Sequence, residues 1–155
     1  MLKPIATATR DLVKLDGVWK FGIDSRLPEE PWLAALDTPL EAAVPASYND
    51  LFTDPAIRDH VGWVYYQRSV QVPRGWAGER ILLRFDAATH SAKVYVDDRL
   101  VGGHVGGYTP FDIDVTEVVK PGTAFRLTVA VSPDLTNTTI PPGKIEVGMT
   151  GAKTQ

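Results

Sequence analysis

The chain has 155 residues, a length that fits one domain with its own hydrophobic core. Its formal net charge of -3 excludes the overall basic field typical of proteins that bind nucleic acid or an anionic membrane. The absence of cysteine excludes disulfides and thiolate metal sites, and no apolar run is long enough for a transmembrane helix.

The N-terminal stretch, MLKPIATATRDLVKLDG, contains no continuous apolar run of the kind found in secretory signal peptides. We therefore expect no signal peptide and a cytoplasmic location.

Apolar and polar residues alternate in several short segments, which is the pattern of strands with one buried face. In the segment VGWVYYQRSVQVP, residues 61–73, Trp63 and Tyr65 fall on the face opposite the apolar one. The segment ends at Pro73, which has no backbone N–H to donate to a neighbouring strand. The positions expected to be buried are, in chain order, Trp19, Phe21 and Ile23; Val64, Tyr66, Val70 and Val72; Ile81, Leu83 and Phe85; Val94 and Val96; Phe111, Ile113 and Val115; and Phe125, Leu127, Val129 and Val131.

Only EEPWLAAL, Glu29 to Leu36, predicts a short helix, with Pro31 near its first turn. Turn signals separate the strands, among them Asp-Asp at 97–98 and Pro-Gly at 121–122. Short, regularly spaced strands with almost no helix predict an all-β fold, an antiparallel jelly-roll β-sandwich. We assign residues 1–145 to this single domain and residues 146–155 to a polar C-terminal tail or a truncated loop.

The glycine pairs Gly102-Gly103 and Gly106-Gly107 lead into a strand rather than a helix, and no Lys-Ser or Lys-Thr follows them. A phosphate-binding loop needs both features, so we expect the glycines to permit turns or close backbone packing between strands.

Asp112 and Asp114 share one face of a strand, with α-carbons roughly 6.5–7 Å apart. One interpretation is a catalytic pair of a glycosidase. The other is the solvated face of a sheet, which is favoured because the opposite face of the strand is apolar. His60, His90 and His104 stand singly, without metal-ligand spacing. We therefore expect no catalytic residue, no metal and no cofactor in this chain.

Aromatic faces can stack on sugar rings, while neighbouring Asn and Asp side chains bind the hydroxyls. The candidate substrate-binding residues are Asn49, Trp63 and Tyr65, although aromatic residues on strands more often pack in a core. The wider aromatic set also includes Tyr48, Tyr66, Tyr95 and Tyr108.

Several motifs in this order resemble the N-terminal domain of family 2 glycoside hydrolases, and within that family they are most similar to β-glucuronidases. The segments are LDGVWKF (15–21), VPASYND (44–50), GWVYYQRSVQVP (62–73), GWAGERILLRFDAATHSAKVYVDD (75–98), HVGGYTPFDIDVT (104–116) and IPPG (140–143).

The resemblance implies a galactose-binding-domain-like jelly roll that precedes an immunoglobulin-like domain and a (β/α)8 barrel. Two glutamates of the barrel would hydrolyse β-D-glucuronides with retention. It also implies a closing strand beyond Gln155, so we expect this sandwich to lack its last strand and to form a homo-oligomer through the open edge.

The leading interpretation is therefore the N-terminal domain of a β-glucuronidase, which supports the barrel and the lip of the active site in an enzyme that binds a glucuronide. The alternatives are a free-standing carbohydrate-binding module and a structural or oligomerisation domain. The charge and hydropathy predict no nucleic-acid partner and no membrane partner.

Overall fold

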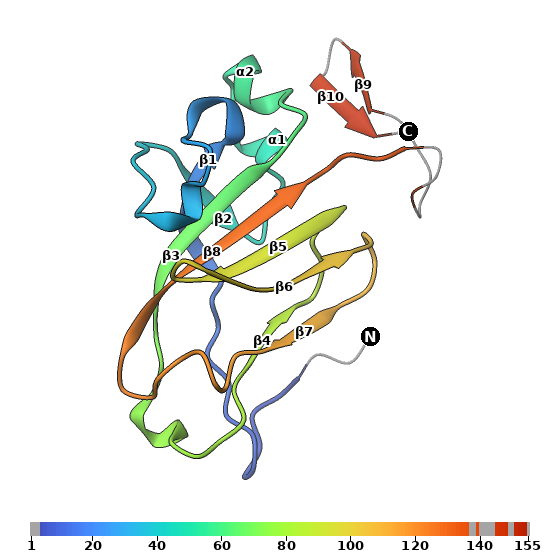
Figure 1. Ribbon diagram of the computed structural model, residues 1–155. Helices are drawn as coiled ribbons and strands as arrows, with labels where there is room; N and C mark the ends of the chain where they lie inside the picture. Colours follow the sequence, from blue (N-terminus) through green and yellow to red (C-terminus); the bar gives the residue numbers. More distant parts are fainter. Residues whose placement is uncertain (1–3, 137–138, 140–144, 149–150, 155) are drawn as a thin grey trace.

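The computed structural model describes residues 4–136, 139, 145–148 and 151–154 (Figure 1). Three single 3-10 turns occupy Asp24–Arg26, Pro31–Leu33 and Arg74–Trp76. The strands and helices are β1 (Gly17–Ile23), β2 (Glu41–Val44), α1 (Tyr48–Leu51), α2 (Pro55–Arg58), β3 (Val64–Gln71), β4 (Leu82–Phe85), β5 (Ser91–Val96), β6 (Arg99–Val105), β7 (Phe111–Asp114), β8 (Ala124–Ser132), β9 (Ile145–Gly148) and β10 (Gly151–Thr154).

The strands form three sheets in which every pairing is antiparallel. The largest has six strands in the order β2-β1-β3-β8-β5-β6, and the other two are the pairs β4-β7 and β9-β10. In Figure 1 the pair β4-β7 lies beside the end of the large sheet that carries β5 and β6. Within the described residues no helix is long or apolar enough to cross a membrane.

The main core fills the space between the six-stranded sheet and the β4-β7 pair. Its buried residues are Trp19, Val70, Val72, Ile81, Leu83, Val94, Val96, Ile113, Val115, Val119, Phe125, Leu127 and Val129. Two sheets packed on one apolar core make a sandwich, so the predicted all-β antiparallel class is confirmed.

Most of the positions expected to face the core are buried, while Tyr66, Phe85, Phe111 and Val131 are only partly buried. The alternation predicts one buried face for β3 and β8, the two central strands of the large sheet, but both of their faces carry buried residues. On the other face of β3 and β8, Tyr65, Gln67, Thr128, Ala130 and Ser132 are buried as well.

The second face is covered by the connection between β1 and β2, residues 24–40, which we call the covering segment. Leu36 packs there with Tyr65, Tyr95 and Ala130, and the ring of Trp32 stacks on Tyr95 with centroids 4.5 Å apart. A strand covered on both faces needs apolar or hydrogen-bonded residues at every position, which explains the buried Gln67 and Thr128.

The helix predicted over Glu29–Leu36 is wrong apart from the single 3-10 turn at Pro31–Leu33. Gln67 supplies the physical reason. Its amide nitrogen donates to the carbonyl of Ala34 at 2.9 Å, and its amide oxygen accepts from the N–H of Leu36 at 2.8 Å. These bonds hold the backbone extended and replace those that a helix would have made.

Residues 146–155 are not simply a tail or loop, because they contain most of the hairpin β9-β10, which lies near α2. In the sequence, Ile145 and Val147 form a single apolar pair, and so short an alternation does not predict a strand. The boundary at residue 145 stays a prediction.

The first glycine pair lies inside β6 and allows close packing, as predicted. A Cβ on Gly103 would stand 2.7 Å from the carbonyl oxygen of Ala92 on β5. A Cβ on Gly102 would stand 2.9 Å from Cδ1 of Ile113, across the core. The turn between β5 and β6 is the predicted Asp-Asp, and Asp97 has a φ of 50°.

We expect Gly103→Ala to destabilise the fold by about 1–3 kcal/mol and by more than Gly102→Ala. The first substitution meets backbone of a paired strand, whereas the second meets the end of a side chain that can move. A double-mutant cycle by urea denaturation checks this. Ile113→Val should relieve the cost of Gly102→Ala and leave that of Gly103→Ala unchanged. Equal relief of both would contradict the contacts described.

Candidate functional site

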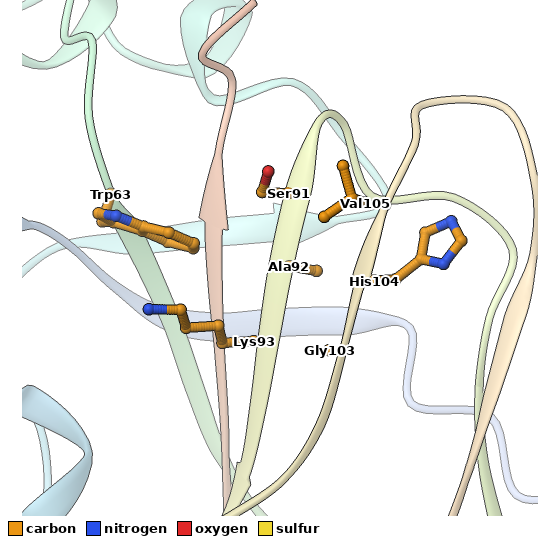
Figure 2. Close-up of a pocket in the computed structure, with 7 residues that line it drawn as sticks. All are labelled: Trp63, Ser91, Ala92, Lys93, Gly103, His104 and Val105. Atoms are coloured by element: carbon orange, nitrogen blue, oxygen red, sulfur yellow. The ribbon is translucent and has the colours of Figure 1, made fainter. Parts of the chain in front are cut away.

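A shallow groove of about 390 Å³ lies over β5 and β6 on the face of the large sheet that points away from the main core. Figure 2 shows Trp63 and Lys93 on one side of the sheet, while the ring of His104 points to the other. His104 and Ala92 therefore contribute mainly their backbone to the groove. The lining residues are Trp63, Ser91, Ala92, Lys93, Gly103, His104 and Val105.

The ammonium group of Lys93 lies 4.6 Å from the ring centroid of Trp63, a cation–π contact. The backbone N–H of Trp63 donates to Oδ2 of Asp24 at 3.0 Å, and its side chain packs against the buried cluster that contains Leu36 and Tyr65. Within the described part of the chain, Lys93 has no carboxylate partner. The groove thus presents an aromatic wall beside a cation that no carboxylate of the described residues neutralises.

The sheet register brings these two side chains together from positions 30 residues apart in the sequence. Val64 pairs with Val131 of β8, and Val131 pairs with Ala92 of β5. Trp63 lies one residue before this row and Lys93 one residue after it, on the same face of the sheet, so their long side chains meet diagonally across β8. Sequence reasoning identified Trp63 and missed Lys93 and Ser91, since no local pattern indicates that β8 lies between β3 and β5.

Tyr65, the second candidate residue, lies in the same cluster as Trp63 but is buried, with 7% of its surface exposed. Burial also raises the pKa of its phenol, with smaller contributions from Tyr95 and Asp24. Tyr65 therefore supports Trp63 from the core side. Its role in binding a substrate stays a prediction.

Asn49, the third candidate, lies in α1, and its amide links α1 to the chain on both sides. The amide nitrogen donates to the carbonyl of Arg58, and the amide oxygen accepts from the hydroxyl of Ser47 at 3.2 Å. Its neighbour Tyr48 belongs to a different core cluster from that of Trp63 and Tyr65. The structure thus brings two of the three candidates together, and the binding role of Asn49 also stays a prediction.

Asp112 and Asp114 lie on the solvated face of β7, as the alternation indicated. Arg84 approaches Asp112 at 3.3 Å, and Nε of Arg80 donates to Asp114 at 2.8 Å. The hydroxyl of Thr116, with Arg80 and the backbone of Thr116, lowers the pKa of Asp114 to about 2. A carboxyl group with so low a pKa is ionised near neutral pH and is unsuited to the role of general acid.

The three histidines have separate surroundings. Nε2 of His60 lies 3.0 Å from Oδ1 of Asp24, and the ring of His104 stacks on Phe111 with centroids 4.5 Å apart. His90 is buried, and neither of its ring nitrogens has a hydrogen-bond partner among the residues that the structure describes. Over the described ranges, no group of three or more His, Asp or Glu side chains is placed to hold a metal ion.

Comparison with known proteins finds similarity along most of the chain. A profile described as "Glycosyl hydrolases family 2, sugar binding domain" matches residues 12–140. A β-glucuronidase from Paenibacillus borealis is 42% identical over 149 residues, which cover 94% of this chain and 25% of that protein. The chain thus spans about a quarter of the length of this relative.

Two solved structures are similar along nearly the whole chain. A β-glucuronidase from an uncultured Clostridium has a TM-score of 0.87 and 39% identity, over 99% of this chain and 27% of its own. A Bifidobacterium dentium β-glucuronidase, complexed with coumarin-3-O-glucuronide, has a TM-score of 0.84 and 46% identity, over 96% of this chain and 24% of its own.

We expect Thr116→Val to raise the pKa of Asp114 from about 2 toward its ordinary value of 3.8, because the substitution removes the hydroxyl that bonds the carboxylate. The folded-state pKa lies below the unfolded one, so Asp114 stabilises the fold above pH 3.8 and loses that effect as the pH falls through about 2. Carboxyl-carbon NMR titration measures the shift.

Thr123→Val is the matched control, because the hydroxyl of Thr123 donates to the carbonyl of Lys120 and to no carboxylate. It should leave the pKa of Asp114 unchanged. An unchanged value in Thr116→Val would show that Arg80 and the backbone N–H of Thr116 set the pKa without the hydroxyl.

Proposed function

This chain belongs to family 2 of the glycosyl hydrolases, within the sugar-binding domain of that family, and from this premise we propose that it works as a domain of a β-glucuronidase. The observation that carries the proposal is the alignment of proteins named β-glucuronidase along almost the whole chain. The parent protein would hydrolyse β-D-glucuronides with retention of configuration, by two glutamates outside these residues.

Within such a parent the domain would support a (β/α)8 barrel and an immunoglobulin-like domain and would shape the lip of the active site. Two observations support this division of labour: the lowered pKa of Asp114 makes it unsuited to acid catalysis, and Asp112 lies in an ion pair with Arg84. The cytoplasmic location stays a prediction from the sequence.

A domain exchange tests the proposal. The corresponding segment of the Bifidobacterium dentium enzyme is replaced by residues 1–155, because that relative shares 46% identity with this chain. We expect the chimera to release p-nitrophenol from its β-D-glucuronide and not from its β-D-glucoside, whereas the isolated chain should show no turnover of either.

The deletion of the same segment from the host enzyme is the control and should abolish folding or activity. A chimera that folds as stably as its host and yet does not hydrolyse the glucuronide would overturn the proposal. Turnover by the isolated chain that Asp112→Asn or Asp114→Asn abolished would place catalysis in this domain instead.

A free-standing carbohydrate-binding module is the second candidate, and the open groove beside Trp63 is the observation that favours it. A module of this kind acts by binding alone. It would bind sugar in isolation, and its loss would leave hydrolysis by a separate catalytic domain intact.

We also propose that the chain self-associates along β6. This strand pairs only with β5 among the strands described, and its exposed Leu100 and Val105 keep 54% and 71% of their surface accessible. An unpaired edge with apolar side chains is a template for pairing with another chain.

Sedimentation velocity at micromolar concentration should therefore detect a dimer or larger species, and Leu100→Lys should shift the chain toward the monomer. Leu33→Lys, at an exposed leucine of the covering segment outside the sheets, is the matched control and should have no effect. A wild-type chain that sediments as a monomer throughout this range would refute association along β6.

A further inference from the structure

We propose that the groove over β5 and β6 is a binding site for the carboxylated ring of a uronic acid. The ammonium group of Lys93 would donate to the carboxylate, and the ring of Trp63 would contact the apolar face of the sugar. Such a site would bind the acidic sugar without cleaving it.

The walls of the groove match the two surfaces of a uronate. A pyranose ring has an apolar face of C–H groups that packs on an aromatic ring, and a uronate adds one negative charge at its edge. Trp63 and Lys93 lie beside each other in Figure 2. The indole ring matches the apolar face of the sugar, and the ammonium group matches its negative charge. Ser91 lines the same groove, so its hydroxyl could exchange hydrogen bonds with those of the sugar.

The floor of the groove is flat at Gly103, which projects no side chain between Lys93 and Val105. The contact with the carbonyl of Ala92 excludes any larger residue at this position without movement of backbone. A ring can thus approach the sheet closely between Trp63 and Val105.

Lys93 is free to exchange its partner. Its contact with Trp63 is a weak interaction at a solvent-exposed position, and within the described residues no carboxylate neutralises it. Lys20 of β1, by contrast, is already paired with Glu41 at 3.1 Å. A ligand carboxylate would make a charge-assisted hydrogen bond with Lys93, which is stronger than a bond between neutral groups.

Trp63 is partly buried without any ligand, because its side chain packs against the cluster that contains Leu36 and Tyr65. Asp24 accepts a hydrogen bond from its backbone N–H. A preorganised aromatic wall avoids the entropy cost of ordering a mobile side chain on binding. The choice of a uronate among carboxylated rings rests on the proposed β-glucuronidase function, and the groove itself does not depend on it.

The test titrates the 15N-labelled 155-residue chain with D-glucuronate, D-glucose and acetate at low ionic strength, observed by NMR at the indole N–H of Trp63 and the amide of Gly103. Glucose lacks the charge and acetate lacks the ring. We expect glucuronate to bind about tenfold more tightly than either one, the discrimination that one charge-assisted contact would supply.

Lys93→Met should reduce glucuronate binding to the level of glucose, and Lys93→Arg should retain most of the preference. Lys20→Met, on the same sheet but already paired with Glu41, is the matched control and should bind as the wild type does. Trp63→Ala should abolish binding of both sugars, and a dispersed amide spectrum confirms that this variant folds.

Equal binding of glucuronate and glucose, no binding of either, or a preference that survives in Lys93→Met would overturn the inference. Acetate that binds as tightly as glucuronate would reduce the site to an unspecific anion contact and would overturn it too. The titration measures no hydrolysis, so its failure leaves the domain-exchange result standing. An inactive chimera, conversely, would not remove a measured preference for glucuronate.

Discussion

The carboxamide of Gln67 attaches the covering segment to the two central strands, β3 and β8. It lies buried in β3 and bonds the carbonyl of Ala34, the N–H of Leu36 and the hydroxyl of Thr128. A buried amide without these partners would be strongly destabilising, so the bonds specify one position for the covering segment. That position buries the second face of β3 and β8 and makes them a central layer rather than a surface.

The extent of the covering segment also determines where the sheet stays open. Trp32 stacks on Tyr95 near one end of β5, and the cover stops before Lys93 and Ser91. Trp63 lies at this boundary, with its ring partly in the core cluster and partly toward the groove. The candidate site is thus the border between the covered and the open parts of one sheet face.

Alternation in the sequence predicted β1, β3, β4, β5, β7 and β8 and most of their core-facing residues, because one apolar layer between two sheets requires a period of two. It could not predict the covering segment, since the bonds made by Gln67 join residues more than 30 positions apart. Trp63 and Lys93 are also far apart in the sequence, so their contact could not be predicted from the residues around Trp63. The strand β6 was also missed, because Gly102 and Gly103 replace the branched residues that usually indicate a strand. The resemblance to a known family identified the domain, which these local patterns alone could not do.

Trp63 makes the fold and the groove thermodynamically linked. The backbone N–H of Trp63 donates to Asp24, and its side chain packs against the cluster that contains Leu36. A ligand that bound only the docked arrangement would therefore also stabilise the docked covering segment. A substitution in that segment that loosened Trp63 would then weaken binding without touching the ligand. In a longer polypeptide the same linkage would let a neighbouring domain that presses on residues 24–40 alter the affinity of the groove, which is coupling between two surfaces through one indole ring.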